Sequence, residues 1–130
     1  MKKLALLVYI ALLAVCAYAQ QPAWNELDNF HELVKTALHP VETGDLKPVK
    51  KNSGLLLQKA GQWKSSAVPA QFNYEAVQTD LDKLVTICQQ LDEAVKKNKS
   101  SAEIKKMALA LHDHFHRILA AIKKNHPASN

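Results

Sequence analysis

Glycine, proline and cysteine are all scarce in this chain of 130 residues, which contains three Gly, five Pro and two Cys. There is no Gly-rich loop to hold a phosphate and no strained turn that would expose a nucleophilic serine. Few segments alternate polar and β-branched residues, which argues against a β-sheet. The absences favour an all-α protein and make a hydrolase the least favoured class, although whether the chain is an enzyme stays open.

Long hydrophobic runs are confined to one segment near the N-terminus. Two lysines precede an apolar run over residues 4–15, and residues 17–19 read Ala-Tyr-Ala. This order is typical of a signal peptide that is cleaved after a small residue. The run is shorter than the roughly 20 residues that span a membrane. We therefore expect a signal peptide over residues 1–19 and a single secreted or periplasmic domain over residues 20–130, without stable membrane insertion after cleavage.

Cleavage would also change the charge and the cysteine count. Loss of Lys2 and Lys3 leaves 15 basic against 12 acidic residues and lowers the net charge from +5 to +3. The remaining lysines lie scattered or in pairs without interleaved aromatic residues, so we do not expect nucleic-acid binding. Cys16 would leave with the signal, and Cys88 would then have no intramolecular partner. Cys88 falls on an apolar stripe, which predicts a buried small hydrophobic residue.

Apolar residues recur at three- and four-residue spacing in four blocks, the period of an α-helix. In the first block the stripe includes His31, and Pro40 is expected to end the helix at His39. The blocks cover residues 24–39, 48–64, 74–97 and 101–124, the last opening on a Ser100/Glu103 capping box. Short connections predict an antiparallel up-down-up-down four-helix bundle. A three-helix bundle crossed by the weak second helix is the alternative.

The histidines of the fourth block form the main functional signal among the six in the chain. His112 and His116 are one turn apart on one flank of a helix, which places their rings about 6 Å apart. Such a pair is a bidentate clip for a metal ion. His114 falls on the opposite flank, and we expect both it and His126 to be surface residues without a special role.

A third ligand is expected from the first helix. If the first and fourth helices are antiparallel neighbours, His31 lies within about one turn of the clip. His31 also falls on the expected core stripe, where an unpaired ring would be costly to bury. The preferred metal ligands are therefore His31, His112 and His116. His39 lies about 12 Å along the axis from His31 and about 80° round it, so it can join only if the turn at Pro40 bends it back.

Imidazole ligands suit Zn, Cu, Ni or Fe, and we expect Cu or Zn at this site. One alternative is a non-covalent haem bundle for electron transfer, with His31, His112 or His116 as an axial ligand and Met107 nearby. Another is a structural or interaction protein of the cell envelope with ordinary histidines. A metal ion with an open position can activate water, which is why enzyme activity stays open. The oligomeric state and the physiological partner are not predicted.

Several short motifs resemble a known group of proteins. They are Asn29-Phe30-His31, Leu38-His39-Pro40, the connection from Glu42 to Lys50 with Gly44, Asp45 and Pro48, then Trp63, and His112-Asp113-x-Phe115-His116. Over most of residues 24–120 the chain resembles secreted bacterial helical-bundle proteins of unassigned function. That resemblance implies that His39 and the connection after it matter. The shape is similar to cytochrome c′ and cytochrome b562 bundles, but the chain lacks the Cys-x-x-Cys-His motif for covalent haem.

Overall fold

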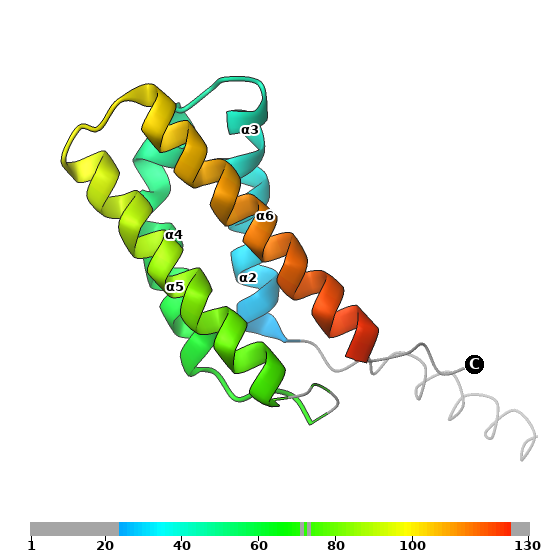
Figure 1. The fold of residues 1–130 in the computed structure, drawn as a ribbon. Helices are drawn as coiled ribbons and strands as arrows, with labels where there is room; N and C mark the ends of the chain where they lie inside the picture. The colour runs from blue at the N-terminus through cyan, green and yellow to red at the C-terminus, as the bar shows by residue number, and fades with distance from the viewer. Residues whose placement is uncertain (1–23, 71, 73, 126–130) are drawn as a thin grey trace, which may run out of the picture.

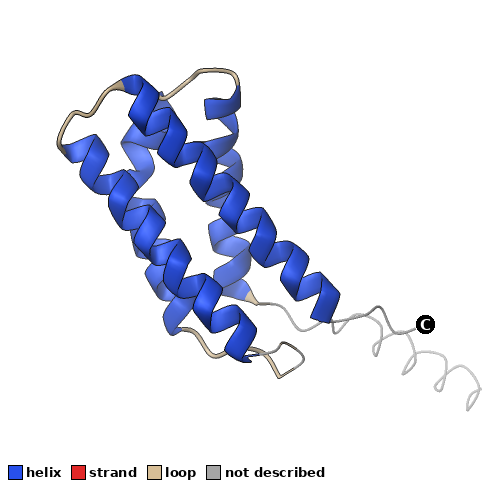
Figure 2. Cartoon of the chain, viewed as in Figure 1, coloured by secondary structure: helices blue, strands red, loops and turns tan. Residues whose placement is uncertain are grey.

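The computed structural model describes residues 24–70, 72 and 74–125. All regular structure in these residues is helical, without a strand (Figure 2). The elements are α2 (Asn25–Leu33), a π-helical segment η1 (Val34–Leu38), α3 (His39–Glu42), α4 (Lys47–Ser65), α5 (Tyr74–Lys96) and α6 (Ser101–Asn125). Because α2, η1 and α3 follow one another without a break, they form one first helix, and the fold is a four-helix bundle. The expected all-α class is confirmed, whereas the signal peptide and His126 lie outside the described residues.

The four helices pack around a single core. α4 packs against α2 and α5, α5 packs against α6, and α6 packs in turn against η1 and α3. The connections from α3 to α4 and from α5 to α6 lie at one end of the bundle, whereas α4 ends and α5 begins at the other (Figure 1). The last turn of the first helix therefore lies beside α6, which positions the site.

Three fully buried rings join three helices in the middle of the core. Phe30 of α2 lies 5.6 Å from the Trp63 ring of α4 and 5.5 Å from the Phe115 ring of α6, between ring centroids. Trp24 meets the edge of Trp63 and donates its indole N–H to Ser66 Oγ at 2.9 Å. Aromatic pairs at these distances stabilise a core beyond the area that they bury. They hold α2 against α4 and α6.

The first helix buries most of the apolar stripe that its periodicity predicted, namely Trp24, Val34, Leu38 and Val41, but it does not fully bury His31. Phe30 is fully buried, whereas His31 is only half-buried and its ring lies against Phe115, 5.3 Å between centroids. The prediction that His31 lies on the core stripe is therefore wrong. The two residues point about 100° apart, and burying the phenyl ring stabilises the bundle more than burying a polar imidazole would.

The first helix also continues past Pro40, contrary to our expectation that it would end at His39. The His39 N–H donates to the carbonyl of Val34, five residues back, which is the π-helical pattern. In a regular α-helix the Pro40 ring would clash with the carbonyl of Thr36 and leave it without a donor. Widening the turn before Pro40 relieves that clash, so one further turn, α3, forms.

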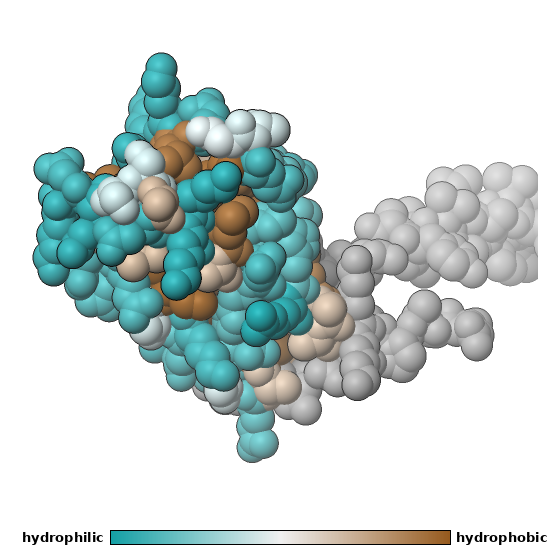
Figure 3. All heavy atoms as spheres, turned by 45° about the horizontal axis from the view of Figure 1, so that its top comes forward, coloured by the Kyte–Doolittle hydropathy of each residue, from teal (hydrophilic) through white to brown (hydrophobic). Residues whose placement is uncertain are grey.

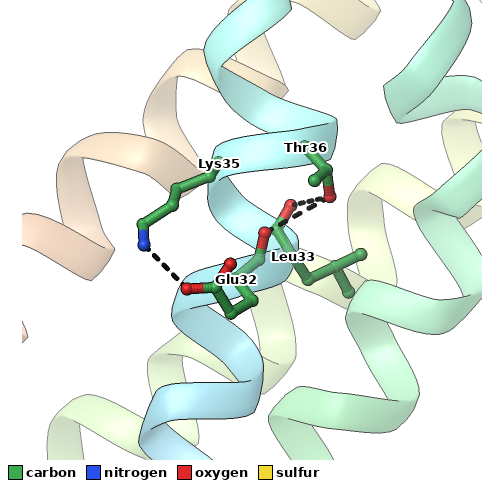
Figure 4. Close-up of polar contacts among 4 residues, drawn as sticks. All are labelled: Glu32, Leu33, Lys35 and Thr36. Atoms are coloured by element: carbon green, nitrogen blue, oxygen red, sulfur yellow. Dashed lines mark hydrogen bonds and ion pairs between the residues drawn. The ribbon is translucent and has the colours of Figure 1, made fainter.

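Side chains support the backbone where α2 passes into η1 (Figure 4). Thr36 Oγ1 lies 3.3 Å from the carbonyl oxygens of both Glu32 and Leu33. Lys35 Nζ lies 2.7 Å from Glu32 Oε1, an exposed ion pair. A threonine that donates to carbonyls one turn back favours a locally distorted helix, so this sequence stabilises the wider turn.

The remaining helices follow the sequence closely. The α4 stripe of Val49, Ser53, Leu56, Ala60 and Trp63 is buried as predicted. At the start of α6 the Glu103 N–H donates to Ser100 Oγ at 3.2 Å and the Ser100 N–H to Glu103 Oε2 at 3.3 Å, which confirms the capping box. Cys88 is fully buried, and burial raises the pKa of its thiol to about 12. The predicted role of Cys88 as a buried hydrophobic residue is confirmed.

The face of the bundle at the end with the α3–α4 and α5–α6 connections is mainly hydrophilic, with hydrophobic residues between the hydrophilic ones (Figure 3). Leu55 is the large hydrophobic side chain recorded as exposed among the described residues. No helix within residues 24–125, as far as they are described, has the length and apolar character needed to cross a membrane.

Candidate metal centre

Three histidines from two helices converge on one place at the surface of the bundle. One ligand atom from each of His39, His112 and His116 lies within 4.8 Å of the other two. His39 is the first residue of α3, and the other two lie on α6. His39 and His116 are exposed, and His112 is half-buried. The cluster therefore combines a ring partly held by the protein with two rings open to solvent.

The α6 pair follows directly from its spacing. His112 and His116 are four residues apart, and their ring centroids lie 4.4 Å apart. Their Nε2 atoms lie 3.1 Å from each other, so one ring donates a hydrogen bond and the other accepts it. With both Nε2 atoms facing one point, a metal ion can replace the shared proton. The expectation that this pair shares one flank of α6 is confirmed.

His39 reaches the pair because of the π-helical segment. Its ring centroid lies 5.2 Å from that of His112, at an interplanar angle of 75°. On a regular α-helix His39 would point about 80° away from His31 and lie a further two turns along the axis. The extra residue per turn in η1 changes the direction of every residue after it, and α3 lies against α6. A π-helical turn of this kind is frequently found at functional sites.

Glu42 brings a carboxylate beside the cluster, next to His112 but outside the group of three mutually close ligand atoms. Its Oε1 lies 3.6 Å from His112 Nε2, and its side chain is 53% exposed against 14% for His112. Glu42 is the last residue of α3, one turn after His39. Gly44, at a φ of 87°, then turns the chain toward α4, a conformation that glycine adopts without strain.

The surroundings of His112 favour the neutral form of its ring. Burial lowers the pKa of His112, and the neighbouring His116 and His39 lower it further, against the opposing charges of Glu42 and Asp113. A metal ion binds the neutral form of imidazole, so a lowered pKa reduces competition from protons. The site is therefore suited to bind a cation near neutral pH.

His31, which we expected to be the third ligand, is not a member of this group. Its ring packs on Phe115, with 5.3 Å between the ring centroids. The structure therefore brings His39 to the α6 pair and leaves His31 as a packing residue. The sequence contained a signal for this outcome, because Pro40 directly after His39 is incompatible with a regular helix. Glu42 was noted only as part of a motif.

His114 differs from its prediction as well. We expected an exposed residue, but its side chain is buried, and its Nε2 lies 2.9 Å from the carbonyl oxygen of Asp80 in α5. Because a carbonyl only accepts, the imidazole donates through Nε2. The flank of α6 opposite the His112 and His116 pair is covered by α5, which helical angles on one element alone cannot reveal. His114 is a structural residue of the α5–α6 interface.

Comparison of the chain with family models, with curated proteins and with solved structures gave no match. The resemblance to secreted helical-bundle proteins therefore stays a prediction, and the functional conclusion depends on the geometry of the three-histidine cluster.

Proposed function

We propose that this chain is an exported helical-bundle module that binds one transition-metal ion, copper or zinc, through His39, His112 and His116. The observation that supports it is the convergence of three imidazole ligand atoms within 4.8 Å of one another. The ligands come from the first and the fourth helix, so the ion would link both ends of the folded chain.

The distances need little adjustment to accept an ion. With Zn–N bonds of about 2.0–2.1 Å, two ligands of a tetrahedral ion lie about 3.3 Å apart. The Nε2 atoms of His112 and His116 are already 3.1 Å apart. His39 is exposed, so its ring can turn the remaining distance without disturbing the core. Three histidines leave one position of a tetrahedral ion for another ligand.

The proposal also includes export of the chain and an antiparallel arrangement of its four helices. A charged, apolar and small-residue sequence over residues 1–19 supports secretion or a periplasmic location. The connections at alternating ends of the bundle (Figure 1) support an antiparallel up-down-up-down arrangement. Outside the cytoplasm, such a bundle would handle or sense copper or zinc.

Titration of the purified chain, begun at residue 20, with Zn(II) and Cu(II) in a calorimeter tests the proposal. We expect one ion per chain and loss of tight binding in His112→Ala. His31→Gln is the matched control, because it also removes an imidazole near α6 but leaves the cluster intact. Wild-type affinity no tighter than that of an isolated surface His-x-x-x-His peptide would overturn the function. A haem titration followed in the Soret region addresses the haem alternative, and we expect the band of free haem to show no shift or sharpening on addition of the protein.

A further inference from the structure

Glu42 stands out among the groups around the cluster because, within the described residues, its carboxylate forms an ion pair with His112 alone. Its Oε1 lies 3.6 Å from His112 Nε2, which itself lies 3.1 Å from His116 Nε2. His112 Nε2 thus has an oxygen as well as nitrogens close to it. The Glu42 carboxylate lies outside the group of ligand atoms that are all within 4.8 Å of one another, so the Glu42 side chain must rotate to share an ion with His39 and His116. The separation of 3.6 Å is close to the about 3.3 Å between two ligands of one tetrahedral ion.

The local backbone allows Glu42 and His39 to act together. They are three residues apart at the two ends of α3, so both side chains project from neighbouring positions on one face. Hydrogen bonds from Thr43 and Asp45 N–H groups to the Pro40 carbonyl close the turn behind them, at 3.2 and 3.0 Å. The Glu42 side chain is 53% exposed, so it can rotate without loss of buried contacts.

No cysteine belongs to the cluster among the described residues. Cys88 is fully buried in the core and holds its proton, since burial raises its pKa to about 12. Met107 is five residues before His112, about 140° round α6, and lines a hollow with Ala94 of α5. Cu(I) selects thiolate and thioether ligands, whereas imidazole and carboxylate ligands suit Zn(II) and Cu(II).

We propose that Glu42 supplies the fourth ligand and makes this a His3Glu site for a divalent ion, Zn(II) or Cu(II), rather than for Cu(I). This inference rests on the proposed function and adds the oxidation state and the ligand that selects it. The carboxylate neutralises one of the two positive charges of the ion, which a fourth neutral ligand would not do. Cu(I) has one charge less to neutralise and no sulfur ligand to hold it.

The test compares Glu42→Gln with Glu32→Gln, an exposed glutamate of the same first helix whose removal changes the net charge equally. Affinities for Zn(II) are measured by competition with a chromophoric chelator, and affinities for Cu(I) by the same method under a reductant. We expect Glu42→Gln to lose at least about 10-fold in Zn(II) affinity, a typical cost of altering a ligand's surroundings. Glu32→Gln should bind Zn(II) like the wild type, and Cu(I) affinity should be the same in all three proteins.

A spectroscopic readout separates ligation from a distant charge effect. X-ray absorption of the zinc-bound wild type should fit three nitrogens and one protein oxygen, and the carboxylate contribution should disappear in Glu42→Gln. Equal Zn(II) affinity in the wild type and Glu42→Gln would overturn the inference while leaving the three-histidine site intact. Tighter binding of Cu(I) than of Zn(II) would overturn it too. Failure of the wild type to bind any of these ions would refute the proposed function itself.

Discussion

Replacing the two histidines of the first helix one at a time gives the sharpest test of the site. The sequence analysis preferred His31 and admitted His39 only through a bend at Pro40, whereas His39 is the one that lies close to the α6 pair. The measurement is the melting temperature of each variant with and without zinc. A ligand that binds only the folded state at 100 times its dissociation constant stabilises that state by about 2.7 kcal/mol. For a domain of this size that is a rise of at least about 10 °C.

Loss of His39 should remove most of that rise. Removing a group that only supports a ligand costs about 10- to 100-fold in affinity, so removing a ligand itself should cost at least about 100-fold. The zinc concentration that was 100 times the dissociation constant of the wild type then equals that of the variant. Zinc therefore stabilises the folded variant by only about 0.4 kcal/mol. His39→Ala should therefore gain only about 2–3 °C from zinc. Because His39 is exposed, its metal-free melting temperature should be close to that of the wild type.

His31→Ala should behave in the opposite way. Its ring packs on Phe115 at 5.3 Å, and loss of such a contact costs about 0.5–1.5 kcal/mol. The metal-free protein should melt lower than the wild type, yet the full rise with zinc should remain. The reasoning is refuted if His31→Ala loses the zinc response and His39→Ala keeps it.

Three further outcomes follow from buried groups. The pKa of His112 in the folded protein lies below its ordinary value of 6.5, so below that pH the unfolded chain binds more protons than the folded one. The free energy of unfolding, measured with urea, should therefore decrease as the pH falls below 6.5. This decrease should be smaller in His112→Asn. His114→Ala should lower the free energy of unfolding by about 2–3 kcal/mol, because it removes the hydrogen bond to Asp80 and leaves a cavity. Its zinc affinity, measured by calorimetry, should be unchanged. Cys88 should resist iodoacetamide at about pH 8 in the folded chain and react in urea, because only the thiolate attacks; rapid modification of the native protein would contradict its burial.

Most of the core, and the helix boundaries other than the end of the first helix, were accessible from local pattern. The stripe of α4, the capping box of α6 and the burial of Cys88 each depend on spacing within one helix. The pairing of His112 with His116 belongs to the same group. Periodicity reveals such features because residues three or four apart share a face whatever the helix packs against.

The third member of the cluster was decided by tertiary structure. Its position depends on a widened turn before Pro40 and on the contact of α3 with α6. Periodicity within the first helix assigned His31 to the core, because it could not weigh an imidazole against the neighbouring Phe30 when both fall near the stripe. It likewise assigned His114 to the surface, because the angle round α6 shows which residues share a flank but not which flank α5 covers.

Local spacing therefore determined that this protein is a helical bundle with a histidine pair one turn apart. The packing of the first helix against α6 decided which histidine completes the group and brought Glu42 beside it. The physical reason is that the direction of the side chains beyond a proline depends on whether the backbone widens to relieve the clash between the proline ring and the preceding turn. Contacts with distant parts of the chain stabilise the widened turn.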